Sequence, residues 1–328
     1  MSLSKRDWVW VLVMSAAVSL QGCEKTSTEL TNEPAHASQK LETPITIKHE
    51  LGTTVINNRP QRVAVLDMNE ADFLDQFDVP IAGMVKDYIP HFLSQYKADD
   101  AVEDLGAIVQ PNMERIHALH PDLILMTPLH AANYQELSEI APTLHFDVNF
   151  NNSQQHIASV KSHLLTLGRI FDKEALAEQK ATQLDARVKE VQDFTKTRPE
   201  KALVVLHNNG AFSNFGLQSR YGFIFNDLGV KPASKIVETS LHGQPISSEF
   251  IQQADPDILY IVDRTAVMEH RAIINPDDVS NPLLRQTTAW KNGRVVFVDA
   301  DAWYIAAASP TSLNIIMDDV LKGYQPTF

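Results

Sequence analysis

The second half of the sequence gathers side chains that are suited to holding a flat anion. Each of them lies in a loop that follows an apolar run, and each apolar run predicts a buried strand. These candidates are Arg220, Tyr221, Arg264, Trp303 and Tyr304. A guanidinium presents a planar fork of donors to oxygen anions and stacks on rings, and tyrosine and tryptophan supply ring faces. Two of them have an equally simple structural interpretation, because Arg264 can pair with Asp263 and Trp303 can lie in the core.

Three further candidates occupy other loops that flank the predicted strands. They are Asn69, His130 and His242. Asn69 is also a residue type that caps helices, here a helix expected from Glu70 to Phe77. His242 and Tyr304 can equally be hydrogen-bonded structural groups. The residue types therefore predict a binding site, with a structural alternative for each member.

The sequence shows no catalytic apparatus. Its 12 histidines are mostly isolated and form no HExxH motif, and His117 and His120 are expected on a helix surface. The single cysteine excludes an intrachain disulfide and cysteine-based metal sites, and no serine has a recognisable base partner. A net charge of -13 disfavours nucleic-acid binding. The sequence therefore favours a binding protein over an enzyme.

An internal repeat indicates the elements that position these residues. Residues 114–125 and 249–260 each begin with Glu, have Ile two positions later and Pro-Asp at positions seven and eight, and end in an apolar run. Each copy predicts a helix followed by a buried strand, and an apolar strand precedes each at 62–67 and 201–207. The chain is therefore expected to be an α/β protein with two Rossmann-like lobes, whose strands end at a shared cleft.

Helical periodicity and composition divide the rest of the chain. We expect an N-terminal lobe at 45–172, a long linking helix at 173–196 that limits closure, and a C-terminal lobe at 197–328. Residues 1–22 combine a basic start with a short apolar run, which is typical of a signal peptide. They lead to Cys23 in a lipobox-like setting, and the polar segment 23–44 is expected to be a flexible tether.

These features together resemble the periplasmic iron-siderophore and cobalamin binding proteins of ABC importers. The stretches 62–69, 104–114, 219–223, 242–246 and 262–264 are most similar to the branch that carries catechol-containing siderophores of the anguibactin and acinetobactin type. The resemblance covers about residues 45–328 and implies the class III periplasmic binding protein fold. It also implies a periplasmic monomer without an intrinsic cofactor, which holds Fe3+ through its siderophore. Cys23 would then carry a lipid that anchors the protein to a membrane, with the inner membrane expected.

The resemblance also assigns roles to individual residues. Arg220 and Arg264 match arginines that face the anionic ferric complex, and His242 and Tyr304 match side chains that can complete the iron shell. The loop 127–130 lacks the arginine of catecholate-binding relatives, which favours a less negative, mixed-donor siderophore. The resemblance further places Glu114 and Glu249 on the surface that docks on the permease of the importer.

Three alternatives remain open from the sequence alone. The same lobes can hold haem or cobalamin instead of a siderophore. An exported hydrolase or metalloenzyme would use His207 or His242. A receptor for free zinc or manganese is the third, and the scattered histidines disfavour it.

Overall fold

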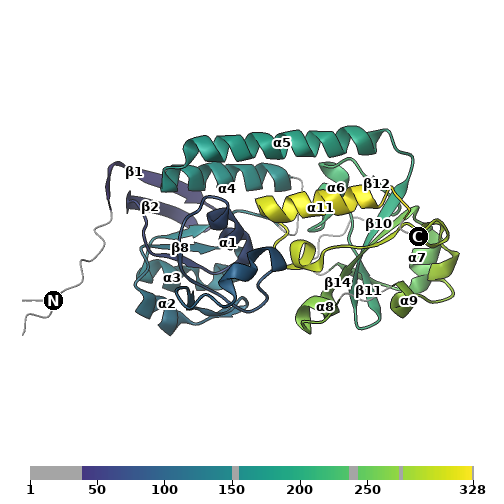
Figure 1. Cartoon of the computed structure of the whole chain (residues 1–328), viewed down its shortest axis with the longest axis horizontal. Helices are drawn as coiled ribbons and strands as arrows, with labels where there is room; N and C mark the ends of the chain where they lie inside the picture. The colour runs from purple at the N-terminus through teal and green to yellow at the C-terminus, as the bar shows by residue number, and fades with distance from the viewer. Residues whose placement is uncertain (1–38, 150–154, 236–242, 273–275, 327–328) are drawn as a thin grey trace, which may run out of the picture. The chain divides into compact units, whose positions relative to one another are not determined.

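The computed structural model describes residues 39–149, 155–235, 243–272 and 276–326. Within Ser38–Phe328, which form a single compact unit, two β sheets are flanked by helices (Figure 1). We call the residues around the first sheet the N-terminal lobe and those around the second the C-terminal lobe. Cys23 and His242 lie outside the described residues. Among the described residues, no helix is long and apolar enough to cross a membrane.

The N-terminal lobe is built on a parallel sheet of five short strands. The lobe as a whole contains the strands β1 Lys40–His49, β2 Gly52–Asn58, β3 Val63–Val65, β4 Ile81–Met84, β5 Glu103–Asp104, β6 Gly106–Ala107, β7 Gln110–Pro111, β8 Leu123–Met126 and β9 Thr143–His145. Its helices are α1 Met68–Asp75, η1 His91–Tyr96, α2 Met113–Leu119, η2 Pro128–Asn133 and α3 Tyr134–Ile140. The strand order is β5-β4-β3-β8-β9, and every residue of β3 and β8 is buried. Such continuous apolar runs are what a sheet covered on both faces requires.

The C-terminal lobe has a mixed sheet of six strands. Its strands are β10 Lys201–Asn208, β11 Ala211–Asn214, β12 Lys231–Pro232, β13 Gln244–Ile246, β14 Ile258–Asp263 and β15 Val295–Phe297. Its helices are α6 Gly222–Asn226, α7 Ser248–Ala254, α8 Arg264–Met268, α9 Pro276–Val279, η4 Leu284–Gln286, α10 Thr288–Lys291, η5 Asp301–Ile305 and α11 Pro310–Lys322. The pairs β10–β14 and β14–β15 are parallel, whereas β10–β11 and β11–β13 are antiparallel. The antiparallel edge adds to the parallel strands that the repeat predicts.

The internal repeat is the same structural unit in both lobes. Helices α2 and α7 each end at a residue in the left-handed conformation, His120 in one lobe and Asp255 in the other. The Pro-Asp that follows leads into β8 or β14. The aspartate carboxylate then accepts a backbone N–H at the start of the neighbouring strand segment: Asp122 from Gln61 at 2.7 Å, and Asp257 from Lys201 at 2.9 Å. In both copies of the repeat, the aspartate therefore connects two parallel strands through a hydrogen bond.

Two details of the N-terminal lobe differ from the sequence-based expectation. Strand β1 begins at Lys40, so residues 40–44 belong to a hairpin rather than to the tether, because backbone pairing with β2 overrides their polar composition. The cap of α1 is Asp67, whose carboxylate accepts the N–H of Asn69 at 2.8 Å. Asn69 therefore lies inside the helix, and its side chain is available for another contact.

Two antiparallel helices join the lobes. Helix α4 spans His156–Phe171 and α5 spans Glu174–Lys196, and α5 packs against α4 and against α11 of the C-terminal lobe. A Cβ placed on Gly168 would lie 2.5 Å from the Cβ of Ala177, so glycine permits the close approach of α4 and α5. Figure 1 shows α5 running along both lobes. Its bounds coincide with the predicted linking segment 173–196 to within one residue.

Hydrogen bonds connect the lobes beneath this helix pair. The carboxylate of Asp72 on α1 accepts both the N–H of Thr311, at 2.8 Å, and its hydroxyl, at 2.6 Å. A carboxylate at the start of α11 is favourable because the first N–H groups of a helix lack partners within it. The side-chain oxygen of Asn69 accepts the N–H of Ala308 at 2.7 Å. These buried contacts disfavour a wide separation of the lobes.

His156 makes a third connection, and it predicts a loss of stability in acid. Its Nε2 lies 2.9 Å from the carbonyl oxygen of Ala307, and its ring stacks on Phe223. Burial lowers the pKa of His156 from 6.5 to about 4; the Ala307 carbonyl opposes this shift and the Arg220 guanidinium adds to it. Between these pH values the unfolded chain binds the proton and the folded chain does not, so stability falls as pH decreases, by about 3 kcal/mol in total.

This prediction is tested by urea unfolding at pH 7 and at pH 4.5. His156→Gln keeps a donor for the carbonyl but cannot titrate, so its free energy of unfolding should fall less than that of the wild type over this interval. An equal fall in both proteins would show that His156 does not contribute.

Candidate functional site

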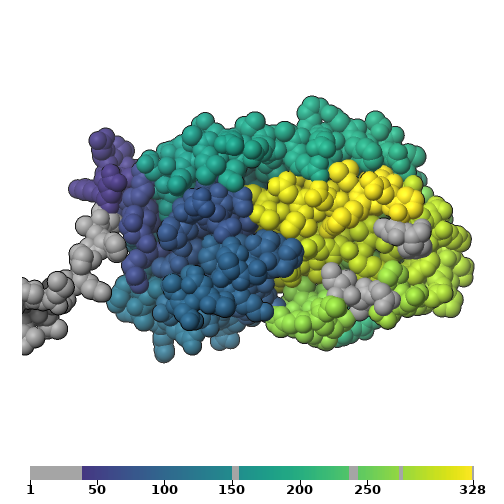
Figure 2. Space-filling model, viewed as in Figure 1, coloured from purple at the N-terminus to yellow at the C-terminus, as the bar shows by residue number. Residues whose placement is uncertain are grey.

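A cavity of about 780 Å³ lies between the two lobes, at the carboxyl ends of their parallel strands. The C-terminal lobe contributes Arg220, Arg264, Met268, Tyr304 and Ile305, and the N-terminal lobe contributes Asp67, Asn69, Tyr88, Ile108, Val109, Thr127, Pro128 and Leu129. Glu50, Val148 and Asn149 complete the lining. Figure 2 shows the two lobes meeting beneath the helix pair α4–α5. The volume is within the usual range for a small-molecule site.

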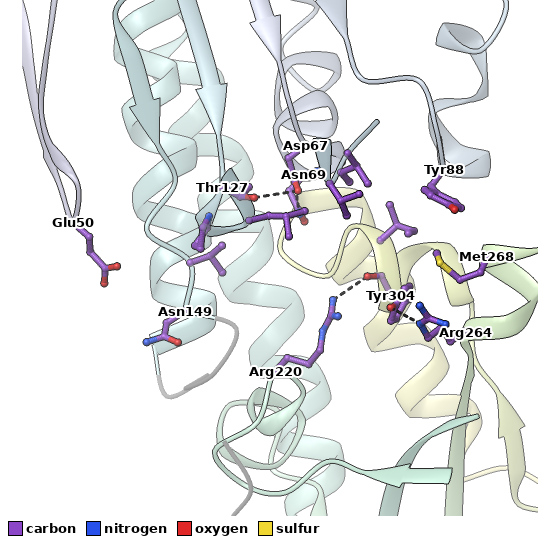
Figure 3. Close-up of a pocket in the computed structure, with 16 residues that line it drawn as sticks. Glu50, Asp67, Asn69, Tyr88, Thr127, Asn149, Arg220, Arg264, Met268 and Tyr304 are labelled. Carbon is purple, nitrogen blue, oxygen red and sulfur yellow. Dashed lines mark hydrogen bonds between the residues drawn. The ribbon is translucent and has the colours of Figure 1, made fainter. Parts of the chain in front are cut away.

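Two guanidinium groups converge on one tyrosine in the C-terminal wall (Figure 3). Arg264, the first residue of α8, donates from Nε to the hydroxyl oxygen of Tyr304 at 2.7 Å. Arg220, in the loop before α6, donates from Nη2 to the carbonyl oxygen of Tyr304 at 3.0 Å. Their Cζ atoms lie 5.7 and 5.5 Å from the centre of the Tyr304 ring. The wall therefore presents two positive charges and an aromatic face to the same cavity.

The Arg220 side chain is largely withdrawn from water, with the residue 7% exposed. Its guanidinium also lies 5.2 Å from the centre of the Tyr221 ring. Taking a charge out of water is costly, and carbonyl dipoles and ring faces offset part of that cost. Arg264 does not pair with Asp263; that carboxylate instead caps α8 by accepting the N–H of Ala266 at 3.3 Å.

The facing wall in the N-terminal lobe is mostly apolar. Val109 is 73% exposed and Leu129 is 48% exposed, although both are large hydrophobic residues. Exposed apolar side chains gathered at one cavity are typical of a binding surface. The two walls together suit a ligand with an anionic side and an apolar or heteroaromatic side.

The floor of the cavity is a buried polar network. Asp67 accepts from the backbone and side-chain N–H groups of Asn69, at 2.8 and 2.7 Å, and from the hydroxyl of Thr127 at 3.3 Å. Burial raises the pKa of Asp67, and the nearby His130 and these hydrogen bonds act in the opposite direction. The fixed carboxylate orients the Asn69 amide, which lines the cavity while its oxygen binds Ala308. Asn69 is thus both a lining residue and an interlobe contact.

Three predicted site residues lie behind the cavity wall and do not line it. Trp303 and Tyr221 are each fully buried, and the Tyr221 hydroxyl donates to the Trp303 carbonyl oxygen at 2.8 Å. His130 is 1% exposed, and its Nε2 lies 2.7 Å from the carbonyl oxygen of Ile108, a lining residue. In this structure these side chains support the lining from the core, and their contact with a ligand stays a prediction. A sequence cannot distinguish such a support from a lining residue when both follow the same strand.

The structure separates the two glutamates from the cavity. Glu114 and Glu249 are exposed in the first turns of α2 and α7, whose caps are Asn112 and Ser247. The backbone N–H of Glu249 and the Ser247 hydroxyl lower the pKa of the Glu249 carboxyl. Their equivalent positions follow from the repeat.

No pattern in the sequence signals the contacts that cross the cleft beside the cavity. Nε2 of His91, on η1, lies 2.7 Å from Asp299, and the His91 N–H donates to Asp301 at 2.9 Å. Tyr88, a lining residue, stacks on His270 with ring centres 5.2 Å apart. These partners are about 180 to 210 positions apart in the chain, so no local spacing could reveal them.

His207 is engaged in a way that disfavours catalysis. Its Nδ1 lies 3.4 Å from the Asp263 carboxylate, and its Nε2 accepts the N–H of Gly210 at 3.0 Å. Both ring nitrogens are therefore occupied by the protein itself, and the ring is 6% exposed. The histidine holds the loop after β10 in place.

Comparisons with known proteins found several that are similar to this chain. A protein-family model described as "Periplasmic binding protein" matches residues 63–302. The ferric-anguibactin-binding protein FatB of Vibrio anguillarum is 62% identical over 315 residues, which are 96% of this chain and 96% of FatB. The petrobactin-binding protein YclQ of Bacillus subtilis is 33% identical over 320 residues, again 96% of each chain. The solved structure of siderophore-binding protein BauB with two acinetobactin molecules and ferric iron has a TM-score of 0.84 and 73% identity, covering 87% of this chain and 100% of that one.

Proposed function

Because the chain belongs to the periplasmic binding protein family, we propose that it captures a ferric siderophore in the interlobe cleft and delivers it to an ABC importer. It is a binding protein and not an enzyme, as are its relatives with 62% and 33% identity. The observation that carries the proposal is the convergence of Arg220 and Arg264 on Tyr304 in one cavity. A ferric complex with catechol and hydroxamate oxygens is a flat-faced anion of the kind that this wall suits.

The proposed ligand is a mixed-donor siderophore of the anguibactin and acinetobactin type. The loop 127–130 places Thr127, Pro128 and Leu129 against the ligand space and contributes no positive charge. The cavity therefore has two guanidinium groups on one side and apolar groups on the other, which favours a moderately charged complex over a tris-catecholate. Relatives that bind ferric anguibactin and a ferric complex with two acinetobactin molecules support this choice. They favour it over haem or cobalamin.

Titration with ferric acinetobactin tests the proposal through the protein's own fluorescence. Trp303 lies directly behind the Tyr304 wall, so an iron complex in the cavity should quench its emission. We expect saturable quenching at micromolar ligand or below, with one ferric complex per chain, and weaker binding of a ferric tris-catecholate. An unchanged emission spectrum, together with no heat of binding in calorimetry, would exclude a siderophore of this type as the ligand.

Tyr304 is proposed to reach the iron when the siderophore leaves a position open. Its hydroxyl oxygen lines the cavity and already accepts a hydrogen bond from Arg264. A phenolate is a hard oxygen ligand suited to Fe3+. His242 remains a proposal from the resemblance, since it lies outside the described residues. Loss of a visible phenolate-to-iron band in Tyr304→Phe, with the siderophore bands retained, checks the contact.

Glu114 and Glu249 are proposed to dock on positive groups of the permease. We expect Glu114→Lys and Glu249→Lys to lower siderophore-dependent iron uptake by about tenfold each, because reversed charges at a docking surface slow association. Affinity for the siderophore should not change, since both residues are exposed and outside the cavity lining. Uptake of radioactive iron by cells checks this, with Glu178→Lys on the exposed face of α5 as the matched control. Equal loss in the control would assign the effect to overall charge.

We further propose that the mature protein is a monomer held at the inner membrane by a lipid on Cys23. The sequence around Cys23 supports the anchor, and one relative of this chain is named as a siderophore-binding lipoprotein. Cell fractionation of Cys23→Ser should then show the protein released from the membrane fraction. Retention of the variant in that fraction would contradict the lipid anchor.

A further inference from the structure

We propose that His49, His145 and Asp147 form a binding site for one zinc-class divalent ion in the N-terminal lobe, separate from the siderophore cavity. One potential ligand atom from each residue lies within 4.8 Å of those of the other two. His49 ends β1, His145 ends β9 and Asp147 follows β9, so the site joins the β1–β2 hairpin to the parallel sheet. Two imidazoles and a carboxylate are a common ligand set for zinc.

The contacts of the two histidines indicate which nitrogen of each would face a metal ion. The Thr54 hydroxyl donates to the carbonyl oxygen of Thr143, so it accepts from Nε2 of His49 at 2.9 Å. The Nδ1 atom of His49 is consequently the nitrogen with the lone pair. Nδ1 of His145 lies 2.6 Å from the Asp147 carboxylate, so these two atoms face one point, where a metal ion would replace the proton that they share.

The lone pair on Nδ1 of His49 has no partner among the described residues, although the atom is buried. The His145 side chain is 1% exposed. Buried polar atoms are almost always paired, so an unpaired imidazole nitrogen beside the His145–Asp147 pair points to a ligand. An imidazole whose other nitrogen donates to a carboxylate or hydroxyl oxygen is the usual arrangement around a protein-bound metal.

The surrounding space and charge fit a single ion. A cavity of about 120 Å³ is lined by His49, His145 and Asp147. His163 also lines it, but its Nε2 is 2.8 Å from the Glu70 carboxylate, so it is already paired. Ligands of one tetrahedral zinc ion lie about 3.3 Å apart at ordinary bond lengths. Small side-chain rotations would therefore complete the site, and Asp147 has the freedom for this because its side chain is 38% exposed.

A metal here would hold two segments that reach the siderophore cavity. Glu50 directly follows His49, and Val148 and Asn149 follow Asp147; all three line the cavity. The Glu50 N–H already donates to both oxygens of Asp147, at 3.0 and 3.1 Å. The ion would thus be a structural element of the rim. It would not be the transported cargo, and its binding does not depend on the proposed siderophore function.

Zinc titration of the full chain, purified in detergent and stripped with EDTA, tests the site in competition with a chromophoric chelator. We expect one zinc ion per chain. Asp147→Asn and His49→Gln should weaken zinc affinity at least tenfold, and Thr54→Val, which removes the partner that fixes the His49 tautomer, by about 10- to 100-fold. His145 is left intact because its replacement would disturb the core.

Controls separate this site from other histidines of the chain. His117→Gln, on the surface of α2, and His91→Gln, in the cleft cluster with Asp299 and Asp301, should leave the zinc affinity within about twofold of the wild type. Zinc should also raise the melting temperature of the wild type but not that of Asp147→Asn. The proposal is overturned if no zinc binds at micromolar concentration, or if the His49 and Asp147 variants bind it as the wild type does.

Discussion

Removal of either cleft arginine, in Arg220→Ala or Arg264→Ala, is expected to weaken ferric-siderophore binding by about 1–3 kcal/mol, or roughly 5- to 150-fold. Each guanidinium lines the same cavity and lies within 6 Å of the Tyr304 ring centre. A charge-assisted hydrogen bond to the ligand would be lost in each variant, in a site where low exposure strengthens such bonds. Calorimetric titration with ferric acinetobactin measures the change.

The two arginines should differ in their effect on the protein itself. Arg220 is 7% exposed and donates to the carbonyl oxygen of Tyr304, so its removal leaves a buried acceptor and a gap. Arg264 is half-buried and shares its contacts with the Tyr304 hydroxyl and Asn208. We therefore expect Arg220→Ala to lower the melting temperature as well as the affinity, and Arg264→Ala to lower chiefly the affinity.

Lysine substitutions separate charge from geometry. Arg264→Lys keeps a positive charge but cannot donate to Tyr304 and to a ligand oxygen in one plane, so most of the affinity loss should remain. Because both arginines contact Tyr304, the double variant should also depart from the sum of the single effects. An affinity of either alanine variant equal to that of the wild type would remove that residue from the site.

The sequence allowed the fold to be predicted because its strongest patterns are local. The Glu…Pro-Asp repeat encodes a helix, a left-handed turn and a buried strand within twelve residues, and both copies form as expected. Ile157, Val160 and Leu164 recur at helical spacing and are buried on α4. Asp122 and Asp257 show that each copy also makes a hydrogen bond to the backbone of a neighbouring strand segment, which the spacing alone did not reveal.

The candidate site was predicted less completely, because local sequence does not determine whether a side chain lines the cavity or is buried behind its wall. Arg220, Arg264, Tyr304 and Asn69 line the cavity, whereas Trp303, Tyr221 and His130 lie behind it. A residue one position from Tyr304 faces the opposite side of the wall, and only the packing of η5 on α11 decides which side is the core.

Contacts between distant segments were beyond the reach of local patterns. His91 and Asp299 come together only when the lobes pack, and His49 and His145 only when the hairpin joins the sheet. Isolated histidines in a sequence therefore do not exclude a metal site. The structure shows which histidines come together and which of their nitrogen atoms lack a hydrogen-bond partner among the described residues.

Replacement of Trp303 is expected to affect stability far more than ligand binding. Its ring is fully buried, with the Tyr221 and Tyr260 ring centres at 5.4 and 6.0 Å, and Nε1 donates to the Asp319 carboxylate at 3.0 Å. Trp303→Ala removes a large buried side chain and leaves a cavity, which costs about 3–5 kcal/mol. Urea unfolding at neutral pH measures the loss.

Trp303→Phe is the sharper variant because it keeps most of the ring volume. Asp319 would lose one donor but retain the Asp299 N–H and Lys322, each at 2.8 Å, so the expected cost is about 1–2 kcal/mol. The backbone carbonyls near Arg220 stay in place, and siderophore affinity should change by less than about threefold. Calorimetry is the suitable measurement, because the substitution removes a fluorophore beside the cleft. A loss of affinity comparable to that of Arg264→Ala, with unchanged stability, would instead mean that the indole ring contacts the ligand and that the wall opens more deeply than this packing allows.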